Sequence, residues 1–197
     1  IFIGQYGRCN KNVRSRLMIS TLLNTATITS STASAAWNSS LITSTYDEYM
    51  IVWTDVHSSQ DNDKLYLLGS TDNGSSYGVT KTTTLFYAYN SETEDSKDVS
   101  YNTDDDRAQQ TTGAALTMAT GADADQSTAG ILHIYSPSST TYVKHFTSRA
   151  SSAQASDYAR DVFAAGYWNT TTAINNIKIQ WSGGNIDNGV FQLYGIA

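Results

Sequence analysis

The stretch A-G-I-L-H-I-Y-S-P-S-S-T-T-Y-V-K-H-F-T, from Ala129 to Thr147, decides the fold of this chain. Within each half, successive side chains would point to opposite faces of a β-strand, so that every second residue shares a face. The alternating positions are Ile131, His133 and Tyr135 against Leu132 and Ile134, then Tyr142, Lys144 and Phe146 against Val143 and His145. Pro137, the only proline of the sequence, lies in the Ser/Thr-rich connection, where a fixed φ and a missing N–H donor are tolerated. The stretch therefore predicts a β-hairpin.

Short runs with β-strand composition recur on both sides of this hairpin, at a spacing of roughly 10 residues, and no long helix is indicated. The expected strands are residues 18–23, 26–29, 46–56, 64–70, one or two within 76–90, then 116–119, 158–169, 173–181 and 190–196. Residues 91–110 are rich in acids and are expected to form a surface loop, and residues 148–156 a polar loop. We therefore predict an all-β fold, an antiparallel β-sandwich of jelly-roll type spanning residues 18–197.

The composition excludes several classes of function. With 12 Lys and Arg against 18 Asp and Glu, the net charge of -6 disfavours binding to nucleic acid. The sequence contains no apolar run of about 18 residues, so no membrane span is expected. Cys9, the single cysteine, cannot form an intramolecular disulfide. The low charged fraction of 15% and the many Ser, Thr, Tyr, Asn and Gly residues are typical of surface-exposed structural or adhesive proteins.

Residues 1–17 differ from the rest of the chain and are expected to form a short N-terminal arm. The arm holds four basic residues and no acid: Arg8, Lys11, Arg14 and Arg16. Their spacing would suit a basic helical face, although Gly4 and Gly7 weaken that prediction. Two interpretations remain open: the arm docks on an acidic partner, or it is a linker with solvated charges.

Three groups of aspartates in expected loops have oxygen ligands of the kind that calcium takes. They are Asp61 with Asp63, Asp104 to Asp106, and Asp123 with Asp125. None has the spacing of an EF-hand, and solvated carboxylates are the favoured interpretation. His133 and His145 could approach across the hairpin, but no third ligand is indicated and His57 is distant in sequence, so cross-strand packing is favoured over a metal site. We predict no metal and no cofactor.

The sequence contains no nucleophile motif G-x-S-x-G and no phosphate-binding motif G-x-x-x-x-G-K-[ST]. Paired carboxylates occur only in the acidic loops, which is weak evidence for a glycosidase. We therefore expect no enzymatic activity. Aromatic side chains could instead line a sugar-binding platform, although most are expected in the core. The tryptophans are Trp37, Trp53, Trp168 and Trp181, and there are 13 tyrosines.

Four stretches, in the same order, resemble a module of structural proteins from marine tailed phages, including cyanophages. They are residues 44–49 (S-T-Y-D-E-Y), 132–146 (L-H-I-Y-S-P-S-S-T-T-Y-V-K-H-F), 165–174 (A-G-Y-W-N-T-T-T-A-I) and 182–196 (S-G-G-N-I-D-N-G-V-F-Q-L-Y-G-I). The resemblance runs from about residue 18 to the C-terminus and leaves out the basic arm. It implies a β-sandwich located in the virion, of tail-fibre or capsid-decoration type, with no catalytic residues.

From this resemblance we expect a protein that assembles with itself as a homotrimer and docks on other virion proteins. Binding of a host-surface glycan is a further expectation. The alternative from a different class is a carbohydrate-binding, lectin-like module that uses its surface aromatic residues.

Overall fold

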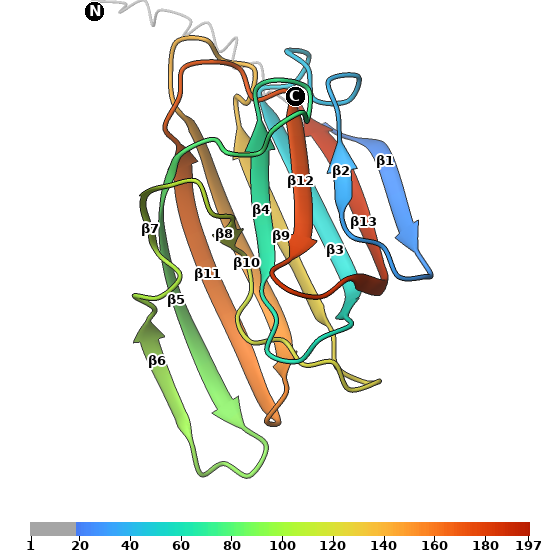
Figure 1. Cartoon of the computed structure of the whole chain (residues 1–197), viewed down its shortest axis with the longest axis vertical. Coiled ribbons are helices and arrows are strands. Elements are labelled where there is room, and N and C mark those ends of the chain that lie inside the picture. Colours follow the sequence, from blue (N-terminus) through green and yellow to red (C-terminus); the bar gives the residue numbers. More distant parts are fainter. Residues whose placement is uncertain (1–18) are drawn as a thin grey trace, which may run out of the picture.

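The computed structural model describes residues 19–197, which form two antiparallel β-sheets and no helix (Figure 1). The large sheet has the strand order β1-β13-β3-β9-β10-β11-β5-β6, with β7 also pairing with β5, and the small sheet has the order β2-β12-β4-β8. The strands are β1 (Ser20–Ile28), β2 (Ala35–Trp37), β3 (Glu48–Ser58), β4 (Leu65–Ser70), β5 (Lys81–Ser91), β6 (Lys97–Tyr101), β7 (Arg107–Gln110), β8 (Ala114–Ala115), β9 (Thr128–Tyr135), β10 (Lys144–Gln154), β11 (Tyr158–Trp168), β12 (Asn176–Trp181) and β13 (Ile186–Ile196).

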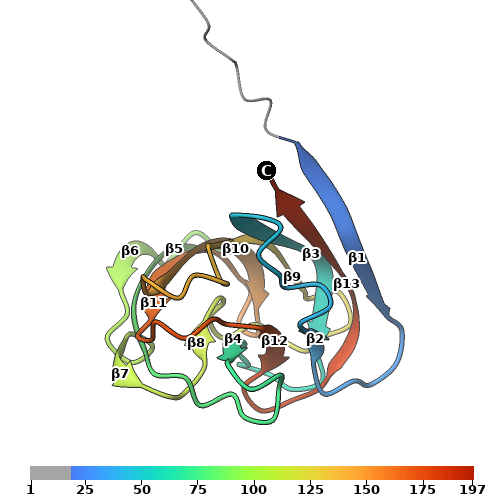
Figure 2. The same ribbon diagram turned by 90° about the horizontal axis from the view of Figure 1, so that it is seen from above.

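The large sheet curves over the small one, so the molecule is a two-layer sandwich (Figure 2). The predicted all-β antiparallel sandwich is confirmed, whereas jelly-roll connectivity stays a prediction. One apolar core fills the space between the layers, because each sheet must bury one face. It holds all four tryptophans, each at most 2% exposed: Trp37, Trp53, Trp168 and Trp181. The tryptophans are therefore core residues, and none of them forms a surface platform.

The predicted hairpin is present and lies in the middle of the large sheet, as β9 and β10. Ile134 pairs with Phe146 and Leu132 with Ser148 in an antiparallel register. The side chains of Leu132, Ile134 and Phe146 are buried against the small sheet, as the alternation of the sequence requires. The second strand begins at Lys144, two residues later than expected.

Three local predictions were wrong. Residues 148–156 were expected to form a loop, but β10 continues to Gln154 and pairs with β11 along its whole length. Its alternation is carried by small side chains such as Ser148 and Ala150, which hydrophobic patterning does not detect. Residues 91–110 contain β6 and β7 rather than loop alone, and residues 116–119 follow the short β8 instead of forming a strand.

The predicted N-terminal arm, residues 1–17 with Arg8, Lys11, Arg14 and Arg16, lies outside the described residues. Within residues 19–197, no helix is long and apolar enough to cross a membrane.

Candidate functional site

The outer face of the large sheet, turned away from the small sheet, carries an apolar patch. In the strand register Arg149 lies beside Phe163, Phe163 beside Phe86, and Phe86 beside Tyr101. Their sequence neighbours, such as Val162 and Leu85, are buried, so these four side chains point outward. We call Phe86, Val99, Tyr101, Arg149 and Phe163 the outer patch.

The rings and the cation of the outer patch are ordered by direct contacts. Phe86 and Phe163 stack with their ring centroids 4.9 Å apart and their planes at 3°. The guanidinium of Arg149 lies over the Phe163 ring at 4.9 Å and binds both carboxylate oxygens of Asp161, at 3.0 and 2.7 Å. This bidentate pair raises the pKa of Arg149, through the hydrogen bond and the charge of Asp161, and fixes the direction of the cation.

The outer patch is exposed at the edge strand β6. Val99 is 69% exposed, Tyr101 52% and Phe86 45%. The solvent face of an antiparallel sheet is normally polar, so this cluster of large apolar side chains at an open edge is a candidate interaction surface.

The three histidines lie apart, in separate environments. His133 lies opposite Thr147 in the register and its Nδ1 is 2.5 Å from Oε1 of Glu48, while His145 packs on the ring of Tyr167 at 5.8 Å. His57 contacts backbone carbonyls of residues 122 and 123. Within residues 19–197 no three His, Cys, Asp or Glu side chains are grouped in a way that could hold a metal ion.

Asp63, one of the predicted calcium candidates, is instead a structural anchor. Its carboxylate is buried and accepts hydrogen bonds from six donors. The donors are the Ser58 hydroxyl, the Ser182 hydroxyl and the backbone N–H groups of Lys64, Ser182, Gly183 and Gly184. Burial raises the pKa of this carboxyl, but the hydrogen bonds from Ser182, Gly184, Lys64 and Ser58 outweigh burial and lower it below its ordinary value.

The expectation that all acids of residues 91–110 lie at the surface was also wrong. The carboxylate of Asp105 is buried between two cations, at 2.8 Å from Nζ of Lys64 and 3.6 Å from Arg107. Both its oxygens accept hydrogen bonds from Lys64, at 2.9 and 2.8 Å. A carboxylate paired in this way can be buried although the surrounding sequence is acidic.

A second surface lies at the ends of β5, β10 and β11, where a hollow of about 570 Å³ opens. We call it the end hollow. It is lined by Asn90, Ser91, Glu92, Asp123, Asp125, Gln126, Ser151, Ser152, Ala153, Gln154, Asp157, Tyr158 and Ala159. Asp123 and Asp125, predicted as calcium candidates, thus join residues from three other parts of the chain.

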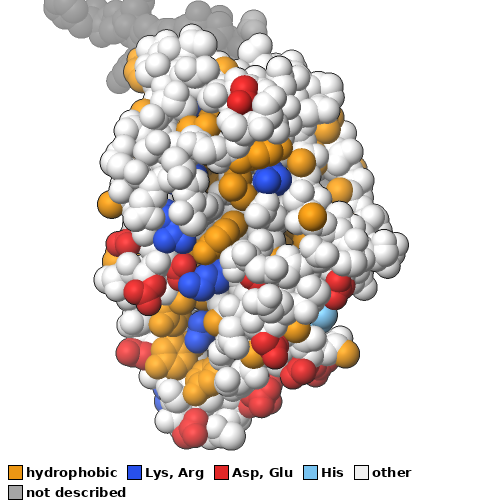
Figure 3. Space-filling view, in the orientation of Figure 1, with side chains coloured by type: hydrophobic (Ala, Val, Ile, Leu, Met, Phe, Trp, Pro, Cys, Tyr) orange, Lys and Arg blue, Asp and Glu red, His pale blue; other side chains and the backbone are white. Residues whose placement is uncertain are grey.

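A row of tyrosines extends from the end hollow along the inner face of β5 and β11. The rings of Tyr89 and Tyr158 meet edge to face at 5.7 Å, and those of Tyr87 and Tyr89 lie 5.9 Å apart. The guanidinium of Arg160 lies over Tyr87 at 5.3 Å. Figure 3 shows hydrophobic and basic side chains gathered on the lower left of this face, with acidic side chains along its lower edge. We call these four residues the tyrosine array.

The sequence does not indicate that the residues of the end hollow lie together. They come from separate connections and strand ends, and only Asp123, Asp125 and the tyrosines were considered as possible binding residues. No family model, no curated protein and no solved structure matches this chain. The two surfaces are therefore the basis on which a function is proposed.

Proposed function

We propose that this chain is a virion structural protein, of tail-fibre or capsid-decoration type, that acts by self-assembly and by docking on the particle. The observation that carries this proposal is the outer patch. Phe86, Val99 and Tyr101 expose large apolar side chains beside an open sheet edge. Burial of such a surface stabilises a complex by about 25 cal/mol for each Å² of apolar area that leaves water.

The edges of the large sheet also favour assembly. β1 and β6 are its two outermost strands, and their outer backbone N–H and C=O groups offer a template for pairing. Copies packed around an axis would cover these edges, and we propose a trimer. The Arg149–Asp161 pair beside the outer patch would set the orientation of the partner more than the affinity.

Copurification tests this proposal. Virions banded in a density gradient are analysed by mass spectrometry for peptides of this chain. We expect the peptides in a fixed ratio to those of the major capsid protein. Finding the chain only as free protein in uninfected cells would exclude a virion role.

A second candidate function is binding of a carbohydrate, and the tyrosine array favours it. Rings on a sheet surface can stack on the apolar faces of sugars, while neighbouring carboxylates and amides bind sugar hydroxyls. Tyr89 and Tyr158 form such a wall next to the polar end hollow. On a virion, this activity would serve adhesion to a host-surface glycan.

A further inference from the structure

We propose that the end hollow binds a non-anionic saccharide, with the ring of Tyr158 as the stacking surface. This inference rests on the carbohydrate-binding candidate and does not depend on virion assembly. The volume of about 570 Å³ lies within the range of roughly 300–1,000 Å³ that is typical of small-ligand sites.

The charges around the end hollow select the class of ligand. Four carboxylates line it, those of Glu92, Asp123, Asp125 and Asp157, and among its described lining residues there is no Lys or Arg. Carboxylates accept hydrogen bonds from hydroxyl donors, so a ligand rich in hydroxyl groups fits. A ligand with carboxylate, sulfate or phosphate groups would be repelled.

Two buried side-chain atoms beside the end hollow lack partners. Oγ of Ser152 and Oε1 of Gln154 have no hydrogen-bond partner among the described residues, although the two residues are only 3% and 8% exposed. Both residues line the hollow. Unpaired buried polar atoms cost folding free energy. Both atoms are covered in the unbound chain, so a sugar hydroxyl would become their partner only after a small movement of the side chain toward the hollow.

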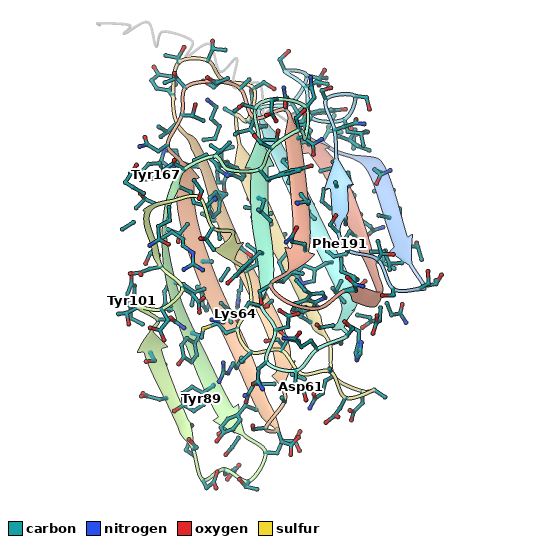
Figure 4. The ribbon with its side chains drawn as sticks, viewed as in Figure 1. Asp61, Lys64, Tyr89, Tyr101, Tyr167 and Phe191 are labelled. Atoms are coloured by element: carbon teal, nitrogen blue, oxygen red, sulfur yellow. The ribbon has the colours of Figure 1, made fainter. Side chains whose placement is uncertain are left out.

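Tyr158 connects this polar hollow to the tyrosine array. It lines the hollow and also meets the ring of Tyr89, which projects from the lower part of β5 (Figure 4). Arg160, two residues further along β11, packs on Tyr87. The rings therefore support one another on two paired strands, which gives a sugar an ordered apolar wall.

The frame of the end hollow is built before any ligand arrives. The N–H of Glu92 donates to the carbonyl of Asp157 at 3.0 Å, and the N–H of Gly121 donates to the carbonyl of Ala153 at 3.0 Å. Gly121 has no room for a Cβ, which would lie 1.7 Å from Oε1 of Gln126. A preformed site loses little conformational entropy on binding.

A titration of the isotope-labelled full chain, followed by amide chemical shifts, tests the inference. Maltotriose, cellotriose and tri-N-acetylchitotriose are the neutral probes, trigalacturonate is the anionic probe and trilysine is the cationic probe. We expect at least one neutral probe to shift amides of residues 90–92 and 151–159, and trigalacturonate to leave them unchanged. No shift with any neutral probe at millimolar concentration, shifts confined to another surface, or binding of trigalacturonate or trilysine alone would overturn it.

Two substitutions in the end hollow then test the residues. Tyr158→Ala should weaken binding of that neutral probe about tenfold or more, because the stacking ring is lost. Asp157→Asn should also weaken it, and asparagine tolerates the left-handed backbone at this position, where φ is 59°. Unchanged affinity in both variants would contradict the assignment.

The matched control is Glu94→Gln, which removes the same charge from the connection between β5 and β6 but does not line the end hollow. The affinity of this variant for the neutral probe should stay within about twofold of that of the unmodified chain, since exposed charges outside a binding site contribute little to binding. The variants Tyr158→Ala and Asp157→Asn should still copurify with virions even when they no longer bind the sugar. The saccharide proposal and the virion proposal can therefore be disproved independently.

Discussion

Gly184 donates its backbone N–H to Oδ2 of Asp63 at 2.7 Å across 121 residues of sequence. The loop that follows β12 thereby encloses a buried carboxylate from the connection just before β4. Gly183 and Ser182 donate to its other oxygen. Successive N–H groups of a loop commonly form such a concave anion site, and here the anion is a side chain of the protein itself.

Asp63→Asn should destabilise the fold by about 3 kcal/mol, because an amide presents two N–H donors to a ring of donors and loses the charge. Chemical denaturation at pH 7 measures the change. Asp104→Asn, on an exposed side chain, should change the unfolding free energy by less than about 0.5 kcal/mol.

The loss of unfolding free energy caused by Asp63→Asn should also depend on pH. Since the pKa of Asp63 lies below its ordinary value, the stabilisation is present above about pH 4 and is lost as the pH falls through the folded-state pKa. An equal loss of unfolding free energy at pH 7 and pH 2 would contradict the claim that the ionised carboxylate of Asp63 stabilises the fold.

Lys81 should make stability rise with pH in alkaline solution. Its fully buried ammonium donates to the carbonyls of Thr111 and Thr112, at 3.0 and 2.9 Å. Burial, with a smaller effect of the Arg107 charge, lowers the pKa of Lys81 to about 8. Between that pH and about 10.4 the unfolded chain binds more protons than the folded one, so the unfolding free energy increases with pH.

The comparison with Lys81→Met isolates this effect. The difference in unfolding free energy between the unmodified chain and the variant should rise by about 1–2 kcal/mol from pH 7.5 to 9.5. Lys97→Met, at an exposed position of β6, is the matched control and should show a flat difference. If the difference in unfolding free energy did not change with pH for either variant, the pKa of Lys81 would not be lowered.

Gly130→Ala should destabilise the central hairpin. A Cβ at this position would lie 2.4 Å from the ring of Trp53 and 2.7 Å from the carbonyl oxygen of Arg149. Forcing an extra carbon into a packed core costs about 1–3 kcal/mol. Gly78→Ala is the control, because no atom lies within 4 Å of its added Cβ. Equal melting temperatures for the two variants would be inconsistent with this packing.

Val99→Lys should prevent self-association without unfolding the module. The side chain is exposed on an edge strand, so the unfolding free energy should change by less than about 0.5 kcal/mol, while a charge in the outer patch opposes burial in an interface. Light scattering gives the mass. Tyr142→Lys, equally exposed but outside the patch, should leave the mass unchanged. An unmodified chain that stays monomeric at high concentration would rule out self-assembly through this face.

The central hairpin could be predicted because its alternation is carried by large apolar residues such as Leu132 and Ile134. The rest of β10 could not, since Ser152 is buried where a hydrophobic residue is expected. Likewise, nothing in the sequence indicates that Lys81 and Lys144 are buried. Their ammonium groups bind carbonyls of connections brought near by the fold.

The candidate surfaces depend on the pairing of distant strands. Tyr89 and Tyr158 meet because β5 and β11 are neighbours, a pairing that local periodicity does not specify. The aspartates of residues 123 and 125 were recognised as candidate ligands, but their place in a polar hollow without a metal cluster in the described part of the chain required the fold.

Cryo-electron microscopy of the virion would locate the module on the particle and show which of its faces is covered. We expect density for this sandwich with the outer patch, Phe86, Val99 and Tyr101, packed against a neighbouring copy or another virion protein. A particle in which this face is turned to solvent while another surface makes the contacts would contradict the proposed assembly, as would a particle without the module.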